Sequence, residues 1–257
     1  MVTQSNMPVE PGRYAKKQIM ANDVVVRWSH GTRFRLVLEL VRKHAGGKLL
    51  DYGCGDGTFL AMCYQEQLFA GMLGADVEQQ QMDDCIKRFA AIPAIDFCMC
   101  RELASGKYDG SFDAITCMET LEHAVNLEEI MQHFRRLLSP KGVIIISVPI
   151  ETGLTLSGKQ IWRRVAGWRN IGDYKYFERY PVGDFLRMTF ATANTNLPRP
   201  KHGPAGLEAY SHYAFNWRAL RKLIAQHFVV ERTQFSPLGF LGGFISSQAW
   251  FICRHKS

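Results

Sequence analysis

The stretch that decides the fold is Leu49-Leu50-Asp51-Tyr52-Gly53-Cys54-Gly55-Asp56-Gly57. It joins a short apolar run, Lys48–Tyr52, to a helical pattern at Thr58–Gln67. Glycines at alternate positions let the backbone turn sharply and approach a ligand closely, because no Cβ intervenes. The helix that follows presents free N–H groups in its first turn. The stretch therefore predicts a strand–loop–helix unit that holds a small ligand.

Strand-like and helix-like segments alternate beyond this loop. Further strands are predicted at 72–77, 95–100, 112–117 and 143–148, and further helices at 79–90 and 127–138. Such alternation over residues 48–148 predicts a parallel sheet with helices on both faces. The pattern stops at Pro149 and resumes with a helix at Trp217–Gln226. The last two strands, at 228–234 and 247–254, are expected to pair antiparallel.

The length of 257 residues suits one domain with an embedded insertion. We expect a single domain over residues 1–257, with a helical lead or lid at 1–46. The residues 150–213, rich in proline, glycine and aromatic side chains, are expected to form an inserted cap or acceptor-recognition region.

The composition excludes several classes of protein. Hydrophobic residues make up 47% of the chain, enough for a core, so a mainly disordered chain is excluded. No unbroken apolar run reaches about eighteen residues, which argues against an integral membrane protein, and the polar start lacks a signal peptide's apolar core. Seven cysteines without a CxxC pair indicate neither a disulfide framework nor a zinc knuckle. We therefore expect reduced thiols and a cytoplasmic protein.

Two acids distinguish the loop from a dinucleotide site. A pyrophosphate loop has the spacing GxGxxG, but here Thr58 takes the place of the third glycine. Asp51, two residues before Gly53, would repel phosphate and attract a cationic ligand. Asp76, at the end of the second strand, is suited to accept hydrogen bonds from ribose hydroxyls. The ligand is thus expected to combine a positive charge with a ribose.

At this point the sequence resembles the class I S-adenosylmethionine-dependent methyltransferases. The resemblance is carried by the glycine loop, by Asp76, by the fourth strand at Phe112-Asp113-Ala114-Ile115, and by the turn Leu138-Ser139-Pro140-Lys141-Gly142. It covers residues 48–150 well and the C-terminal strands loosely. The alternatives are a nicotinamide-dependent oxidoreductase, which Asp51 and Thr58 disfavour, and a non-catalytic binding subunit that kept the fold.

The resemblance implies a Rossmann-like α/β fold with helices on both faces of a mostly parallel, seven-stranded sheet. Its strand order is 3-2-1-4-5-7-6, with the last strand antiparallel and the cap inserted after strand five. The resemblance also implies S-adenosylmethionine as cofactor. The cofactor-binding residues that it implies are Asp51, Tyr52, Gly53, Cys54, Gly55, Gly57, Asp76, Val77, Glu102 and Met118.

An acidic–histidine cluster follows the fourth strand, where the methyl acceptor should approach. If a helical turn begins at Glu119, then Glu119, Glu122 and His123 share one face. The segment is similar to the ubiquinone-biosynthesis O-methyltransferases and to the small-RNA 3′-terminal 2′-O-methyltransferases, which implies that these three residues bind a divalent metal. Without a metal, His123 is a candidate general base. The alternative is that the acids merely favour a helix start through its dipole.

The acceptor is predicted to be a hydroxyl of a small molecule, a lipid-linked molecule or a glycan, and RNA is the alternative. The net charge of +7 favours anionic partners, including nucleic acid and an anionic membrane. Cations and aromatic rings alternate in Ile161–Arg169 and Tyr174–Tyr180, which suits a lid, a membrane contact, base stacking or simple packing on the sheet. The run Arg27–Arg35 is a candidate for the other side of the lid. His212 is placed at the surface or facing the active site, and the oligomeric state is left open.

Overall fold

The computed structural model describes residues 8–20, 24–168, 180–203, 208–244 and 246–256. Its main sheet has seven strands in the order β3-β2-β1-β4-β5-β9-β8. The strands are β1 (Lys48–Tyr52), β2 (Gly71–Asp76), β3 (Ile95–Met99), β4 (Phe112–Met118), β5 (Leu138–Pro149), β8 (Phe228–Ser236) and β9 (Gln248–His255). The first five are parallel, and β9 is antiparallel to both β5 and β8. The predicted fold class, strand order and antiparallel last strand are confirmed.

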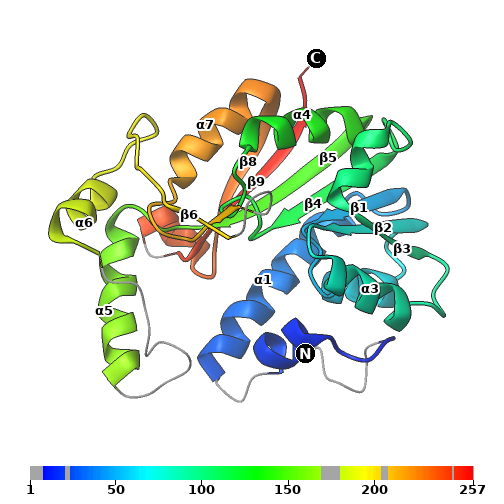
Figure 1. Cartoon of the computed structure of the whole chain (residues 1–257), viewed down its shortest axis with the longest axis horizontal. Helices are drawn as coiled ribbons and strands as arrows, with labels where there is room; N and C mark the ends of the chain where they lie inside the picture. Colours follow the sequence, from blue (N-terminus) through cyan, green and yellow to red (C-terminus); the bar gives the residue numbers. More distant parts are fainter. Residues whose placement is uncertain (1–7, 21–23, 169–179, 204–207, 245, 257) are drawn as a thin grey trace.

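Helices cover both faces of this sheet (Figure 1). One face packs against α1 (Val24–Arg42), α2 (Thr58–Gln65) and α3 (Gln79–Arg88), and the other against α4 (Leu127–Leu137) and α7 (Trp217–His227). Alternate residues of each strand serve the two cores. Leu49 of β1 lies with the first set of helices and Leu50 with the second, and both are fully buried. This alternation gives the continuous apolar strands that a doubly covered parallel sheet requires.

Local signals explain where the covering helices begin. The side chain of Asn126 accepts a hydrogen bond from the Glu129 N–H, and that of Asn216 accepts from the N–H groups of Arg218 and Ala219. An asparagine in this position satisfies donors that the first helical turn leaves free. These caps fix the first residues of α4 and α7 on the second face of the sheet.

The turn expected at residues 139–142 is absent, and that detail of the prediction is wrong. Strand β5 already begins at Leu138, which pairs with Phe112 at the start of β4. A register shift between Phe112 and Ala114 accommodates the early start. A strand irregularity of this kind absorbs the extra residues that the sequence suggests as a turn.

The insertion between β5 and α7 contains α5 (Leu154–Trp168), α6 (Val182–Thr189) and a two-stranded sheet of β6 (Lys201–His202) and β7 (Ala209–Tyr210). It has a small core of its own, made by Leu156, Met188 and Ala214. In Figure 1, α5 and α6 lie to the left of the main sheet. The predicted aromatic run at 174–179 falls outside the described residues. None of the described helices is both long enough and apolar enough to cross a bilayer.

Candidate functional site

The glycine loop lies against the segment that follows β4. Gly53 has a φ of 77°, and a Cβ at this position would lie 2.2 Å from the Thr120 Oγ1 atom. The Gly53 N–H donates to the carbonyl of Ala75 at 2.7 Å. Only glycine tolerates both this backbone conformation and this close approach. The loop after β1, the end of β2 and the segment after β4 thus meet at one edge of the sheet.

Asp76 closes the loop from β2. One carboxylate oxygen accepts from the Gly55 N–H at 2.9 Å, and the other from the Val77 N–H at 2.7 Å. The carboxylate is therefore fixed at the carboxyl end of β2, where ligands bind in open α/β sheets. The first of these oxygens keeps lone-pair capacity for a ligand hydroxyl, whereas the second also accepts from the Glu78 N–H at 3.2 Å. This geometry suits the ribose role expected of Asp76.

Asp51 is the buried charge of the site. Its side chain is 2% exposed and accepts a 2.7 Å hydrogen bond from the Thr116 hydroxyl on β4. Burial raises the pKa of Asp51 to about 7, and the Thr116 hydrogen bond only partly opposes this effect. A ligand that brings a positive charge stabilises the ionised form of this carboxyl group.

The other residues expected to bind the cofactor lie around the same edge, and they differ in whether the side chain or only the backbone faces the loop. Tyr52 packs its ring against Phe134 in the core beneath α4, so it presents only backbone to the loop. Val77 is exposed beyond Asp76. The Glu102 carboxylate accepts from the Met99 N–H at 3.0 Å in the short helix η3 (Cys100–Ser105). Met118, the last residue of β4, is half-buried.

The helical turn expected to begin at Glu119 is absent, which corrects the predicted geometry of the cluster. Glu119 has a φ of 51°, and its N–H donates to the Ser147 carbonyl at 2.9 Å, which continues the pairing of β4 with β5. Its carboxylate accepts from the Ser147 hydroxyl at 3.2 Å and lies 3.6 Å from the guanidinium of Arg33. Strand pairing therefore separates Glu119 from the turn that carries Glu122 and His123.

Glu122 is fully buried, and within the described structure neither carboxylate oxygen has a hydrogen-bond partner. Burial and the nearby negative charge of Glu119 raise the pKa of Glu122 well above its ordinary value. One oxygen lies 3.8 Å from His123 Nε2 and 3.7 Å from His212 Nδ1. An unpaired buried carboxylate is costly to leave unsatisfied, so this one indicates a missing cation or proton.

The two histidines complete a cluster on Glu122. His123 Nδ1 is 2.7 Å from the Tyr210 carbonyl, so it carries the proton and leaves a lone pair on Nε2. One ligand atom each from Glu122, His123 and His212 lie within 4.8 Å of one another. His212, half-exposed, comes from the insertion and faces the cluster. The structure thus brings His212 to Glu122 and His123, whereas Glu119 lies apart from these three.

Arg33 was not singled out by the sequence analysis. It lies on the inner side of α1, 6% exposed, and besides Glu119 it contacts His30 Nδ1 at 3.1 Å. Its Nε atom has no partner among the described groups, and burial lowers the pKa of the guanidinium. One signal was present: Arg33 falls in line with the buried Val37 and Val41 at helical spacing. A cation on an apolar stripe points to an inward anionic partner.

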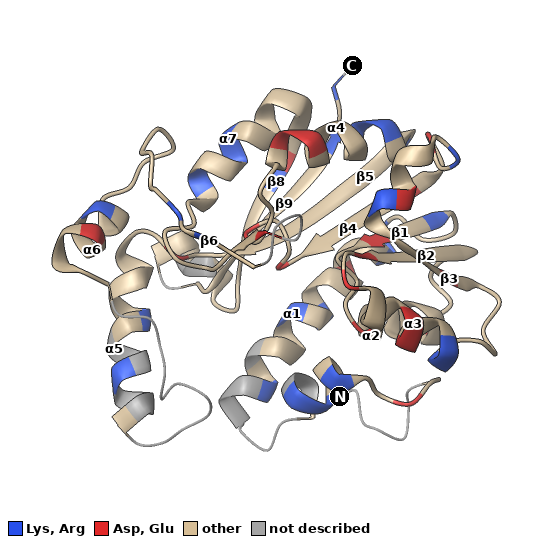
Figure 2. Ribbon diagram, in the orientation of Figure 1, with Lys and Arg blue, Asp and Glu red and all other residues tan. Residues whose placement is uncertain are grey.

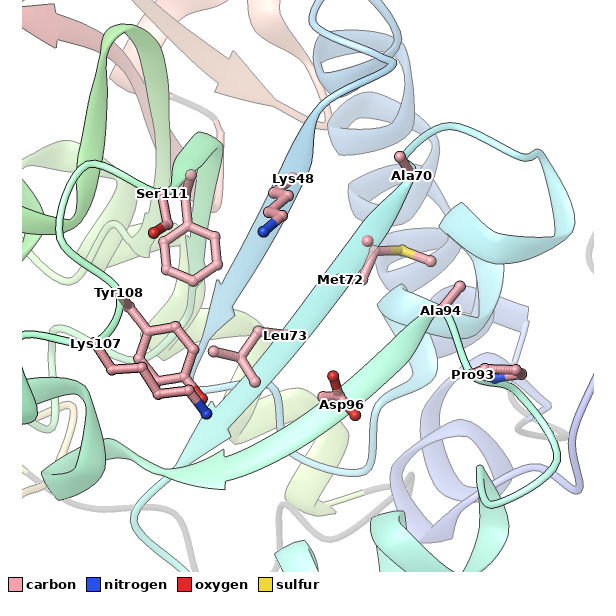
Figure 3. Close-up of a pocket in the computed structure, with 12 residues that line it drawn as sticks. Lys48, Ala70, Met72, Leu73, Pro93, Ala94, Asp96, Lys107, Tyr108 and Ser111 are labelled. Carbon is pink, nitrogen blue, oxygen red and sulfur yellow. The ribbon is translucent and has the colours of Figure 1, made fainter.

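A hollow lies at the edge of the sheet opposite the glycine loop (Figure 3). It has a volume of about 330 Å³ and is lined at the amino ends of the strands by residues such as Lys48, Met72 and Asp96. Ligands of parallel α/β sheets bind at the carboxyl ends instead. The functional edge is therefore the one that carries the glycine loop.

Comparison with known proteins agrees with this geometry. Residues 27–181 match a protein family described as "Methyltransferase domain". The chain is 30% identical over 186 residues, 70% of its length, to the ubiquinone biosynthesis O-methyltransferase of Chromobacterium violaceum, of which it covers 75%. It is 31% identical over 153 residues, 58% of its length, to the enzyme of the same name from Idiomarina loihiensis, of which it covers only 61%.

A solved structure shows the same fold. The PH0226 protein of Pyrococcus horikoshii aligns over 96% of this chain and 100% of its own, with a TM-score of 0.59 and 14% sequence identity. At this identity the likeness concerns the fold alone.

Proposed function

Because this chain belongs to the methyltransferase family and is a class I S-adenosylmethionine-dependent methyltransferase, we propose that it methylates a hydroxyl group of a small-molecule, lipid-linked or glycan acceptor. The observation that carries the proposal is the buried, unpaired Glu122 carboxylate with His123 and His212 beside the glycine loop. A hydroxyl must lose its proton to accept a methyl group, and this cluster offers proton acceptors at the right edge. The relatives named as ubiquinone biosynthesis O-methyltransferases give additional support.

The chain's own residues bind and orient the cofactor in this proposal. S-adenosylmethionine supplies a methyl group on a positively charged sulfonium sulfur. Asp51 attracts the positively charged amino group of the cofactor. Asp76 accepts hydrogen bonds from the ribose hydroxyls, and the loop from Gly53 to Gly57 contacts the cofactor through its backbone alone. Glu102 and Met118 flank the adenine and the methionine portion, respectively. The unpartnered Nε of Arg33 is suited to a carboxylate.

Transfer requires alignment and removal of one proton. The acceptor oxygen forms a bond to the methyl carbon while the carbon–sulfur bond breaks, and that electron pair stays on sulfur. Without a metal in the cluster, the hydroxyl proton passes to Glu122 or to the free Nε2 of His123. The raised pKa of Glu122 makes its carboxylate, when ionised, a stronger proton acceptor than an ordinary glutamate. Glu119 acts through its negative charge, which contributes to that raised pKa.

The cluster also fits a divalent metal. Glu122 offers an oxygen without a partner, His123 offers Nε2, and His212 offers Nδ1. One carboxylate and two imidazoles form a common ligand set for Zn²⁺ and other transition-metal ions, with positions left for water or substrate. Such an ion, when bound, would lower the pKa of the acceptor hydroxyl. We propose Glu122, His123 and His212 as ligands, with Glu119 adding negative charge from outside the set.

We also propose that the flanking regions close the site, with residues 1–46 as the lid and 150–213 as the acceptor-recognition cap. Arg33 from the first region reaches Glu119, and His212 and Tyr210 from the second reach the cluster. Exclusion of water would favour methyl transfer. All seven cysteines are free thiols, which supports the further proposal of a reducing, cytoplasmic location.

The test is transfer of a radiolabelled methyl group from S-adenosylmethionine to fractionated lipid, glycan and RNA extracts. We expect label in a lipid or small-molecule fraction, and mass spectrometry of the labelled product should identify a methyl ether rather than a methyl ester or a methylamine. A chelator should abolish transfer, and added Zn²⁺, Mn²⁺ or Mg²⁺ should restore it. Label found only in RNA would favour the alternative acceptor that the net charge of +7 suggests.

Variants separate the cluster from the cofactor site. His123→Ala and His212→Ala should each lower turnover by about 10²–10⁴-fold while binding S-adenosylhomocysteine normally. His202→Ala, at an exposed histidine of the same insertion, is the matched control. If a chelator has no effect and His123→Ala is fully active, catalysis rests on alignment alone.

A further inference from the structure

Arg218 is a partly buried cation that has no anion beside it in the described structure. It lies in the first turn of α7, and its Nη1 atom is buried without a hydrogen-bond partner among the described groups. Burial lowers the pKa of the guanidinium, and no described carboxylate opposes this effect. A guanidinium that is removed from water costs free energy unless it is paired. Its position therefore suits a ligand that brings a negative charge.

The other buried arginines near the site have partners. Arg33 lies 3.6 Å from the Glu119 carboxylate, and Arg199 donates to three backbone carbonyl groups. Arg218 instead lies over the ring of Trp217, 4.6 Å from its centroid. Figure 2 shows basic residues and no acidic residue on α7, and the sequence of α5 contains no acidic residue either. An arginine that an aromatic ring holds in place, with donors unused, is suited to bind a carboxylate or a phosphate.

The guanidinium of Arg218 lies at the start of α5. Gly153, the residue before this helix, has a φ of 86°, and a Cβ there would lie 3.4 Å from the Arg218 Nη1 atom. The preceding residue, Thr152, is fully buried, and its hydroxyl has no partner among the described groups. The first turn of a helix leaves backbone N–H groups free, and its dipole favours an anion. Three kinds of donor thus meet here: a guanidinium, a hydroxyl and the N–H groups of a helix start.

This place lies at the carboxyl edge of the sheet, as the cluster on Glu122 does. Only four residues separate the end of β5 from α5. Leu156, in the first turn of α5, packs with Ala214 in the small core of the insertion, and Ala214 lies between His212 and Arg218 in the chain. The same short stretch of chain therefore supplies one histidine of the cluster and Arg218, which places Arg218 on the acceptor side of the site.

We propose that Arg218, the Thr152 hydroxyl and the first turn of α5 form a binding site for an oxyanion, a carboxylate or a phosphate, that the methyl acceptor carries. The guanidinium donates two parallel hydrogen bonds to the anion, and the Thr152 hydroxyl donates another. The assignment of the anion to the acceptor rests on the proposed function, whereas binding of the anion itself does not.

The first experiment measures anion binding without methyl transfer. The full chain, with the cofactor site filled by S-adenosylhomocysteine, is titrated with inorganic phosphate or with acetate at constant ionic strength. Line broadening of the anion in phosphorus or proton NMR gives the Kd. We expect saturable binding, and the anion with the lower Kd identifies the group that the site prefers.

Variants of α7 assign this binding to Arg218. Arg218→Gln should raise the Kd about tenfold, because charge-assisted hydrogen bonds are lost. Arg218→Lys should raise it less, since it keeps the charge but not the planar fork. Arg221→Gln, at an exposed arginine of the same helix, makes the same change in net charge and should bind like the wild type.

The melting temperature without anion separates this role from a structural one. Arg218→Gln should not lower it, because the substitution removes a charge that is buried without an ion-pair partner. A lower melting temperature together with unchanged anion binding would make Arg218 a structural residue and would overturn the proposal. Wild-type protein that binds neither phosphate nor acetate would overturn it as well.

The second experiment asks whether the acceptor carries the anion. In the methyl-transfer assay with the accepting extract fraction, Arg218→Gln should raise the KM for the acceptor about tenfold, far more than it lowers kcat, and the preferred anion should compete with the acceptor. Anion binding without such competition would overturn the assignment to the acceptor. Arg218-dependent anion binding in a protein that methylates no fraction would confirm the anion site and refute the proposed function.

Discussion

Cofactor affinity should depend on pH through Asp51. This carboxyl group is 2% exposed, its pKa lies at about 7 because of burial, and the Thr116 hydroxyl is its hydrogen-bond donor. A ligand with a positive charge beside it favours the ionised form. Binding should therefore release a proton when it occurs below about pH 7, and affinity should rise with pH across this range.

The size of the effect follows from the fraction of protein that is ionised. If only ionised Asp51 binds well, the apparent Kd is the intrinsic Kd divided by that fraction. With a pKa of about 7, the fraction falls from about nine-tenths at pH 8 to about one-tenth at pH 6. The apparent Kd should then rise about tenfold, which corresponds to ~1.4 kcal/mol.

The same pKa predicts an opposite effect on stability. The pKa rises from an ordinary 3.8 to about 7 on folding, so the protonated form is favoured in the folded protein. The contribution of Asp51 to the free energy of unfolding is fully present below about pH 4 and is lost as the pH rises through about 7. The total loss is ~4 kcal/mol. Asp51→Asn has no charge to bury. It should be more stable than the ligand-free wild type at pH 8, by up to that amount, and similar to it near pH 4.

The assay is calorimetric titration with S-adenosylhomocysteine from pH 6 to pH 8, in two buffers of different ionisation enthalpy so that released protons are counted. Asp51→Asn is the control, since any titration of the ligand's own amino group remains in both proteins. Urea unfolding at pH 4 and pH 8 gives the stability difference. An affinity that does not change with pH in the wild type, or that changes equally in the variant, would refute the reasoning.

Three further substitutions test the loop. Asp76→Ala should raise the Kd for S-adenosylhomocysteine about 100-fold, since the two hydrogen bonds from the ribose hydroxyls to a charged carboxylate are lost. Turnover at saturating cofactor should change little. Calorimetry measures the Kd and steady-state kinetics the turnover, and an unchanged Kd would contradict the ribose role. Gly53→Ala should lower the free energy of unfolding by about 2–4 kcal/mol, because a φ of 77° and the Thr120 hydroxyl at 2.2 Å both oppose a Cβ. Its control is Gly110→Ala, where φ is 60° and no atom lies within 4 Å, so that only the conformational part, about 1 kcal/mol, remains. Asp56→Ala should speed hydrogen exchange in residues 8–20, because the Asp56 carboxylate accepts from two backbone N–H groups of that segment; protection equal to the wild type would show that the segment is held by other contacts.

The sheet, and the meeting of Asp51, Asp76 and the glycine loop at one edge of it, could be predicted because their signals are local. Asp51 stands next to the glycines that it serves, and Asp76 ends a strand whose apolar run is visible in the sequence. Parallel strands bring their carboxyl ends to one edge, so correct strands in correct order place both acids together. The register pairs of β1 with β2 and with β4 give this result.

The acceptor side could not be predicted to the same degree, because its geometry depends on contacts between distant segments. Glu119 is followed by turn residues, which suggests a helix start, but its N–H pairs with the Ser147 carbonyl on β5 and its φ of 51° is not helical. The sequence does not decide between a surface position and a site position for His212, because it is one of two histidines in an irregular region. Arg33 interrupted an apolar helical stripe, and that irregularity was the one available sign of its buried position.

The segment after β4 contacts both the glycine loop and the insertion. Strand β7 pairs with it: the Tyr210 N–H donates to the His123 carbonyl at 3.0 Å, and the Tyr210 carbonyl accepts from the His123 ring at 2.7 Å. Arg199 donates to the Glu122 carbonyl, and its positive charge partly offsets the raised pKa of that residue. The insertion therefore sets the tautomer of the histidine and makes a small contribution that lowers the raised pKa of the glutamate. In the proposed mechanism, changes in this region would alter proton transfer, because these contacts hold both His123 and Glu122.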